Sequence, residues 1–223
     1  MTSLSLAQVC RLGATALLCA LTGGCSTLRP NAPLPPLSYS LDSVQTAPPA
    51  TTRSAAISPK AAPTLIVSSP HAASGFDSQR IIYVREAHRL EYYARSEWVD
   101  TPARMLAPLI VAALENSRSF RAVVLTPSAA TGDLRLDTEI IRLQHELGSQ
   151  PSRERLTLRA YLVDNTTRRV LASREFDESV AVASEDPYGA VMAANRVVQT
   201  VLEQLAGFCS EASVPRQASV TRR

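Results

Sequence analysis

Alternation of apolar and polar side chains over three consecutive segments constrains the fold of this 223-residue chain more than any other feature. Residues 156–162 alternate Leu and Ala with Thr, Arg and Tyr. Residues 134–143 alternate too until Ile141 shifts the phase, as a β-bulge would. Residues 170–182 form a third such segment after a polar turn at 164–169. Because side chains of a strand point alternately to opposite faces, the pattern predicts an antiparallel sheet with one buried and one wet face.

Shorter segments upstream have the composition of strands. They are rich in β-branched, aromatic and aliphatic residues, which pack well on a pleated surface. These runs are residues 37–41, 64–68, 81–84, 89–93 and 120–125. A polar turn at residues 85–88 separates the third run from the fourth and predicts a hairpin.

Two segments, residues 101–117 and 187–208, repeat apolar side chains at steps of three and four, the spacing of an amphipathic helix. Both segments follow a capping aspartate and begin with a proline, which suits the first helical position because no backbone donor is needed there. The two starts read Asp100-Thr101-Pro102 and Asp186-Pro187. Together the elements predict an α+β fold, an α/β sandwich in which two main helices pack on a mostly antiparallel sheet.

The first 24 residues predict a lipoprotein signal peptide. Arg11 precedes an apolar run over residues 12–21, which is too short to span a bilayer, since a spanning helix needs about 20 residues. The sequence Leu-Thr-Gly-Gly-Cys then ends at Cys25 and resembles a lipobox, although Thr22 stands where the aliphatic residue is usual. We therefore expect cleavage before Cys25 and fatty acylation, for example with palmitate, on its thiol. The alternative is a secreted protein cut near Ala20, with Cys25 a free thiol.

The residue after the lipobox cysteine bears on location, because aspartate there favours retention in the inner membrane of double-membrane cells. Ser26 therefore predicts an outer-membrane anchor with the domain in the periplasm. Nine of the fifteen prolines lie between residues 26 and 70, and proline excludes long helices and central strands. We expect a lipidated linker over residues 25–36, one domain over 37–210 with a flexible Pro/Ala-rich loop at 42–63, and a disordered tail at 211–223.

Charge and cysteine content exclude several classes of function. The formal charge is only +3, and acidic and basic residues alternate along the chain, which argues against nucleic acid as a partner. Cys10 and Cys19 belong to the signal peptide and Cys25 is expected to be lipidated, so Cys209 is the thiol that remains free. It ends an apolar helical pattern and is expected to be a small core residue rather than a nucleophile.

No motif for catalysis or cofactor binding stands out in the sequence. Phosphate-binding glycine loops, nucleophile elbows and zinc helices are missing, and no cofactor, metal site or catalytic residue is predicted. The histidines, His71, His88 and His145, fall in separate segments and are expected at the surface.

Four aromatic residues, Tyr83, Tyr92, Tyr93 and Trp98, hold much of the aromatic surface of the chain. They are candidate contacts for a partner or a lipid, because aromatic rings lose little entropy on binding. The alternative is packing in the core and across the hairpin.

The order of these elements resembles a known family. The runs Gly-Phe-Asp-Ser-Gln-Arg-Ile-Ile-Tyr ending at Tyr83 and Arg-Leu-Glu-Tyr-Tyr-Ala-Arg-Ser-Glu-Trp ending at Trp98, the proline-started helix and Ser-Phe-Arg-Ala-Val at 119–123 are similar to the auxiliary lipoprotein component of ABC-type transport systems. This family includes the PqiC-type lipoproteins that accompany Mce-domain lipid transporters. The similarity extends over residues 37–209; residues 42–63 and 99–101 depart from the family pattern.

The resemblance implies a non-enzymatic module whose partners are an Mce-domain protein and an ABC permease and ATPase, in a system that moves lipid between membranes. It brings no catalytic residues. The oligomeric state stays open, and a homo-oligomer is one option. Two other functions stay open as well: a structural lipoprotein of outer-membrane assembly, and an envelope hydrolase, which would need a histidine joined to a buried carboxylate.

Overall fold

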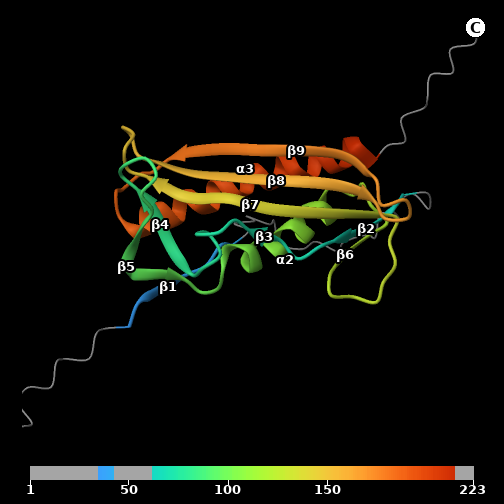
Figure 1. The fold of residues 1–223 in the computed structure, drawn as a ribbon, viewed down its shortest axis with the longest axis horizontal. Coiled ribbons are helices and arrows are strands. Elements are labelled where there is room, and N and C mark those ends of the chain that lie inside the picture. Colours follow the sequence, from blue (N-terminus) through green and yellow to red (C-terminus); the bar gives the residue numbers. More distant parts are fainter. Residues whose placement is uncertain (1–34, 43–61, 214–223) are drawn as a thin grey trace, which may run out of the picture. The chain divides into compact units, whose positions relative to one another are not determined.

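The longest strand of the molecule organises the rest of the fold. A computed structural model describes residues 35–42 and 62–213. In chain order its strands and helices are β1 (Leu37–Tyr39), β2 (Thr64–Val67), β3 (His71–Ala72), β4 (Arg80–Val84), β5 (Glu91–Trp98), α2 (Pro102–Asn116), β6 (Ala122–Leu125), β7 (Leu134–Glu146), β8 (Arg153–Asp164), β9 (Val170–Ala181) and α3 (Pro187–Ser213). All nine described strands form one sheet, which is built on the two edges of β7 (Figure 1).

The two edges of β7 have different partners. Along one edge β7 pairs with β8 in antiparallel register, and β8 pairs in the same way with β9. Along the other edge three short strands, β2, β3 and β4, follow one another, and all three run parallel to β7. Beyond them β6 pairs with β2, β5 with β4, and β1 with β5.

The α+β prediction is confirmed: the longest strand pairs are antiparallel, and the sheet as a whole is mixed rather than purely antiparallel. Alternation identified the meander of β7, β8 and β9, whose hairpin connections make neighbouring strands antiparallel. The short strands lie farther away in sequence, and alternation cannot give the direction of a strand whose partner is distant. The two-residue strand β3 had no sequence signal of its own.

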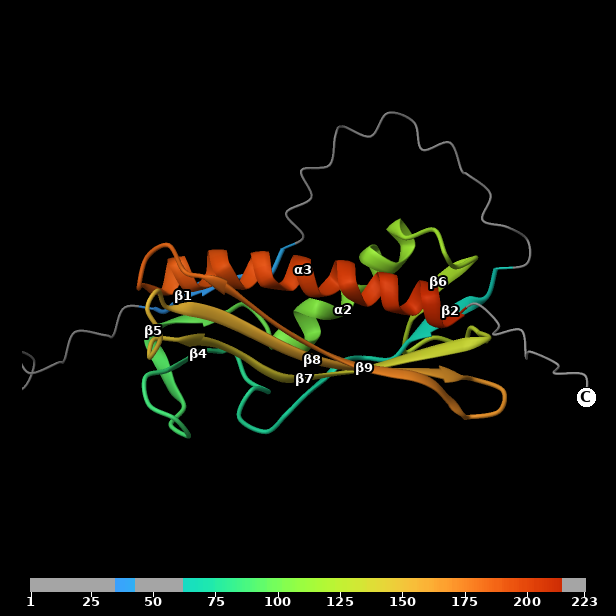
Figure 2. The same ribbon diagram turned by 90° about the horizontal axis from the view of Figure 1, so that it is seen from above.

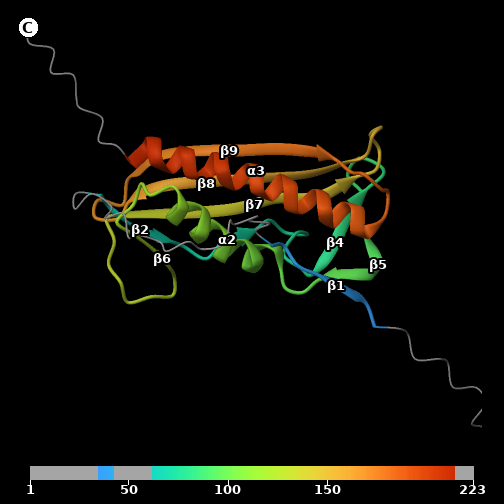
Figure 3. The ribbon, with the colours of Figure 1, turned by 180° about the vertical axis from the view of Figure 1, so that it is seen from behind.

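Both helices cover the same face of the sheet (Figures 2 and 3). Buried aliphatic residues of α2 and α3 pack on those of β7 and β8, among them Leu106, Ile110, Leu136, Leu158 and Val201. Asp186 caps α3 as expected, since its Oδ1 accepts a hydrogen bond from the Gly189 amide at 2.7 Å. At α2 the capping residue is Thr101, whose side chain makes no cap bond, although Pro102 does start the helix.

A β-bulge in β7 decides which residues face the helices. The register with β8 shifts between Ile140 and Arg142, where the sequence predicted a bulge at Ile141. After the shift Leu143 pairs with Leu156, and both are buried on the helix side. His145 is in the same phase as Leu143, so the bulge turns this histidine inward.

Several predicted segments extend beyond the described ranges. The signal peptide, Cys25 and most of the loop 42–63 lie outside them. Helix α3 continues to Ser213, five residues past its predicted end and into the predicted tail, the rest of which lies outside the described residues. In the part of the chain that the structure describes, neither helix is long and apolar enough to cross a membrane.

Candidate functional site

A cluster of buried polar side chains lies on the helix side of the sheet, where β4, β5, β7 and β8 meet. We call Tyr83, Tyr93, His145 and Glu154 the tyrosine–histidine cluster. His145 and Glu154 are directly opposite each other in the β7–β8 register, and both side chains are buried. Opposite residues of an antiparallel pair have their Cβ atoms about 5 Å apart, so the imidazole and the carboxyl group are close neighbours.

The two tyrosines connect this buried pair to the surface. The Tyr93 hydroxyl and His145 Nδ1 lie 2.8 Å apart, at hydrogen-bond distance. The Tyr93 and Tyr83 rings pack with their centroids 4.8 Å apart, and the Tyr83 hydroxyl donates a hydrogen bond to Glu91 at 3.1 Å. Arg85 stacks over the Tyr83 ring at 5.0 Å and lies 3.9 Å from Glu91. The cluster therefore runs from a buried carboxyl to an exposed arginine.

Burial keeps the inner part of the cluster uncharged. Desolvation, reinforced by the negative charge of Glu146, raises the pKa of Glu154 well above its usual value of 4.5. Desolvation lowers the pKa of His145, although Glu185 and Asp186 act in the opposite direction. The pKa of Tyr93 rises to about 12, mainly through desolvation. Burial thus favours the protonated acid at Glu154 and the neutral imidazole at His145.

Within the described ranges, three buried polar atoms at this end of the sheet have no hydrogen-bond partner: His145 Nε2, Glu154 Oε2 and Ser152 Oγ. Ser152 and Glu154 lie two residues apart along the chain and so point to the same face. Buried polar groups are normally satisfied by protein or by an ordered water, and three such groups side by side suit a bridging water.

The first turn of α3 closes the cluster. Asp186 is close enough to raise the pKa of Tyr93 and to act on His145. Gly189 lets the loop before α3 fold tightly against the first turn, since a Cβ at that position would clash with the Ser184 carbonyl oxygen. With the turn packed on the sheet, neither His145 nor Glu154 is open to solvent.

The four aromatic residues predicted as contacts do not form one group. Tyr83 and Tyr93 belong to the cluster, whereas Tyr92 is half-exposed and its ring packs against the Arg80 guanidinium at 4.0 Å. Trp98 is 2% exposed and lies in the hydrophobic core, so it is not available to a partner. Tyr92 and Tyr93 are adjacent in β5 and therefore point to opposite faces. The register of β5 with β4 shifts between Ile82 and Arg80, so Trp98 does not share the phase of Tyr92.

The structure also corrects the expectation that the histidines lie at the surface. His71 and His88 are exposed, but His145 is completely buried. The sequence contained a signal that could have found the cluster, since His145 shares the apolar phase of Leu143 and Glu154 that of Leu156. A polar residue in an apolar phase of a strand is a candidate for a buried site.

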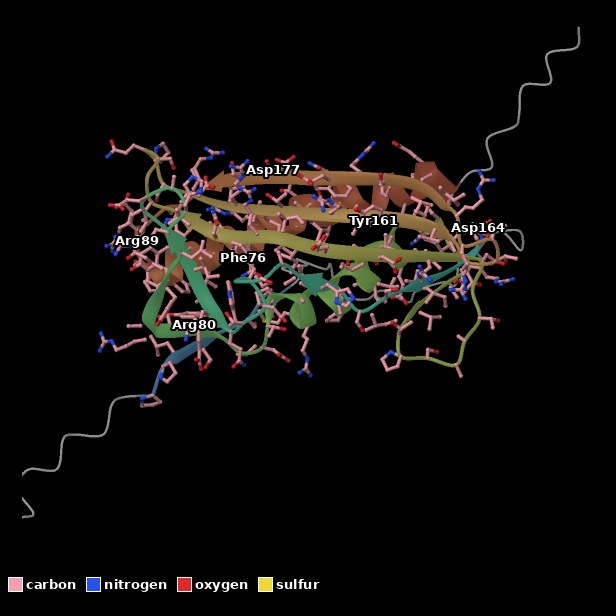
Figure 4. The ribbon with its side chains drawn as sticks, viewed as in Figure 1. Phe76, Arg80, Arg89, Tyr161, Asp164 and Asp177 are labelled. Atoms are coloured by element: carbon pink, nitrogen blue, oxygen red, sulfur yellow. The ribbon has the colours of Figure 1, made fainter. Side chains whose placement is uncertain are left out.

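The opposite face of the same strands is charged and exposed to solvent (Figure 4). We call Arg155, Arg159 and their acidic partners Asp177 and Glu175 the arginine face. Arg155 binds Asp177 on β9, with Nε to Oδ1 at 2.7 Å, and Arg159 binds Glu175 at 2.9 Å. The Arg155 hydrogen bond lowers the pKa of Asp177 to about 2. The face is therefore a mosaic of paired charges with no excess of one sign to attract a polyanion.

Cys209 and the described acidic residues suggest no further chemistry. Cys209 is buried in the core, as expected, and burial raises the pKa of its thiol to about 12, which leaves it in the unreactive protonated form. Among the described residues, no three His, Cys, Asp or Glu side chains gather where they could hold a metal ion.

The helices and the two unlike faces of the sheet form an α+β domain. Residues 39–206 match the family described as ABC-type transport auxiliary lipoprotein component. The chain belongs to this family, as its resemblance in sequence implied.

Solved structures support the same fold. The chain is similar to protein XCC0632 from Xanthomonas campestris, with 26% identity, a TM-score of 0.64, and coverage of 69% of this chain and 87% of that one. A second similar structure, of an uncharacterized protein, has 11% identity and a TM-score of 0.58, and the match covers 80% of this chain and 98% of the other. No curated protein matches the chain.

Proposed function

We propose that this protein is a lipid-anchored periplasmic component of an ABC-type intermembrane lipid transport system and acts by binding protein partners. In this proposal acylated Cys25 holds it in the outer membrane, and its partners are an Mce-domain protein and the permease and ATPase of the same system. The observation that carries the proposal is the family match, which spans residues 39–206 and so nearly the whole described domain.

The physical need for such a component follows from the cost of moving lipid through water. Each exposed CH2 group costs about 0.8 kcal/mol, so lipid needs a covered path between membranes. A domain on a proline-rich linker at the outer membrane keeps a carrier protein at high effective concentration beside the bilayer. Paired charges on the arginine face suit a docking role, because partner binding can exchange one set of ion pairs for another.

The structure gives one argument for the hydrolase alternative, since it places His145 opposite the buried carboxyl of Glu154. General acid–base catalysis needs these groups within reach of a substrate and a water. Both are closed to solvent, and burial disfavours the charged form of each. The cluster is therefore better explained as part of the domain interior, and we favour partner binding.

Crosslinking in intact membranes tests the proposal. The full-length protein is crosslinked and purified, in parallel with Cys25→Ala and with Cys209→Ala as a matched control that also removes a thiol. We expect Mce-domain and ABC components with the wild type and with Cys209→Ala. We expect Cys25→Ala to move into the soluble fraction. Recovery of peptidoglycan enzymes alone would reject transport, and recovery of a β-barrel assembly factor alone would favour the assembly function.

A further inference from the structure

Three of the eight large apolar side chains that are exposed in the described residues gather around the start of α3. Leu37 is 62% exposed, Tyr188 60% and Met192 46%. The half-buried Tyr39 joins them, since its ring centroid lies 6.4 Å from that of Tyr188. We call these four residues the tyrosine–methionine patch.

Local structure brings the four side chains to one surface. Tyr188 and Met192 are four residues apart on α3 and therefore share a helical face. Leu37 and Tyr39 are two residues apart on β1, so their side chains point to the same side, about 7 Å apart. The patch thus joins the edge strand β1 to the first two turns of α3, and Figure 3 shows these elements at the same end of the domain.

The β1 segment is fixed to α3 by Asn195. Asn195 Oδ1 accepts a hydrogen bond from the Asp42 amide at 2.7 Å, and its Nδ2 donates to the Ser40 carbonyl at 3.4 Å. On its other side β1 pairs with β5, and the Val99 amide donates to the Tyr39 carbonyl at 2.8 Å. The exposed apolar side chains are therefore presented on an ordered support.

The length of chain before the patch indicates what covers it. Leu37 is twelve residues after Cys25, and an extended chain spans at most about 3.6 Å per residue, or roughly 40 Å here. A patch that follows the anchor so closely cannot move far from the bilayer that holds the acyl chains. Tyrosine side chains combine an apolar ring with a polar tip and are enriched at the membrane interface.

We propose that the tyrosine–methionine patch rests on the headgroup region of the membrane in which Cys25 is anchored. This inference rests on the proposed function, because it needs the acyl anchor. Weak contact is sufficient, since the tether makes the second binding event intramolecular. Asp42 and Asp186 border the patch, so the surface it fits is zwitterionic rather than strongly anionic. Contact at the start of α3 would fix the orientation of the domain, with the patch toward the membrane.

A polarity-sensitive fluorophore at residue 192 tests this inference. The acylated full-length lipoprotein with Met192→Cys is labelled and reconstituted into phosphatidylethanolamine–phosphatidylcholine vesicles. Label enters selectively, because Cys25 is acylated and Cys209 is buried. The matched control is Val170→Cys, at a 58% exposed apolar residue that begins β9, away from the first turn of α3 (Figure 3). We expect a blue shift and quenching by doxyl-labelled lipid at residue 192 and neither at residue 170.

Further outcomes separate this inference from the proposed function. Adding Tyr188→Ser to the labelled protein should abolish the quenching while the protein stays on the vesicles, and phosphatidylglycerol should weaken it. Vesicle association with equal signals at residues 192 and 170 overturns the membrane contact alone. Protein that does not associate with vesicles overturns the anchor and this inference with it. A third outcome is that the parent protein gives no signal at residue 192 and that Tyr188→Ser changes its oligomeric state. This result would show that a second copy of the chain, and not the membrane, covers the patch.

Discussion

Glu154 and Arg155 are neighbours on β8, yet they occupy opposite environments. Glu154 faces the helices, where burial raises its pKa and favours the protonated carboxyl. Arg155 faces solvent, where it holds the pKa of Asp177 at about 2 and keeps that carboxylate ionised. Glu154 on β8 and Asp177 on the neighbouring strand β9 thus have carboxyl pKa values shifted in opposite directions.

This comparison shows how one sheet separates two tasks. The helix face supplies stability through buried apolar area, and its polar cluster is neutral because charge would be costly there. The arginine face contributes little to stability, since exposed ion pairs give about 0–1 kcal/mol each. It is therefore free to carry charges that serve solubility and, in the proposed function, partner binding.

Truncation of the helix face should cost the most. Leu158 is almost completely buried between the sheet and the helices, and Leu158→Ala should lower the free energy of unfolding by about 2–5 kcal/mol through lost burial and a cavity. The matched control is Arg159→Ala, one residue along β8 on the arginine face, which should cost far less because its ion pair is exposed to solvent. Denaturant titration of both variants measures this difference, and equal losses would contradict the division of tasks.

Two glycines of α3 offer a sharper contrast. Gly189→Ala places a Cβ against the Ser184 carbonyl oxygen, at 2.1 Å before any relaxation, and should destabilise the domain by about 1–3 kcal/mol. Gly207→Ala meets no atom within 4 Å and should stabilise α3 by about 0.5–1 kcal/mol, because alanine favours helix. Thermal unfolding of the two variants should shift in opposite directions. A shift in the same direction would mean that the first turn of α3 is loosely packed.

The pH profile tests the neutral state of Glu154. In the unfolded chain this carboxyl ionises near its usual value of 4.5, whereas the raised pKa keeps it protonated in the fold. The stability of the wild type should therefore fall as the pH rises above 4.5 toward the folded pKa. Glu154→Gln mimics the protonated form and should lack this decline.

The His145 contribution has the opposite sign and serves as an internal control. Its lowered pKa means that stability falls as the pH drops below 6.5, in the wild type and in Glu154→Gln alike. Urea titrations between pH 5 and 8 measure both trends. If the two proteins had parallel profiles above pH 4.5, the buried carboxyl would be ionised or solvated.

Removal of the Asp177 carboxylate should have the smallest effect on the free energy of unfolding. Asp177→Asn should cost about 1 kcal/mol or less at neutral pH, and less in high salt. The folded pKa of Asp177 is lowered, so its contribution is present above pH 3.8 and is lost as the pH falls through about 2. Unfolding in low and high salt checks the effect. A cost as large as that of Leu158→Ala would assign a structural role to the arginine face.

The sequence predicted the elements whose signals are local. The alternation of β7 and β8, the bulge at Ile141 and the Asp186 cap all depend on neighbouring residues, and all are present in the structure. The parallel pairing of β2, β3 and β4 with β7 was not predictable, because it joins segments about 70 residues apart.

The candidate site was predicted only in part. The sequence pointed to Tyr83 and Tyr93 but not to their neighbours His145 and Glu154. The bulge in β7 reverses which of the following residues face the helices, and this reversal turns His145 inward. For Trp98 the sequence left core packing and partner contact open, since an aromatic residue in a strand can serve either, and the structure places it in the core.

The proposed docking role and membrane-facing patch both depend on acylation of Cys25, because both require the domain to stay at a bilayer. Intact-mass and peptide mass spectrometry of the protein extracted from membranes tests this directly. The account predicts a mature chain that begins at Cys25 and carries a diacylglyceryl thioether with an amide-linked acyl chain. An exported chain with an unmodified thiol at Cys25, or one cut near Ala20, would contradict it.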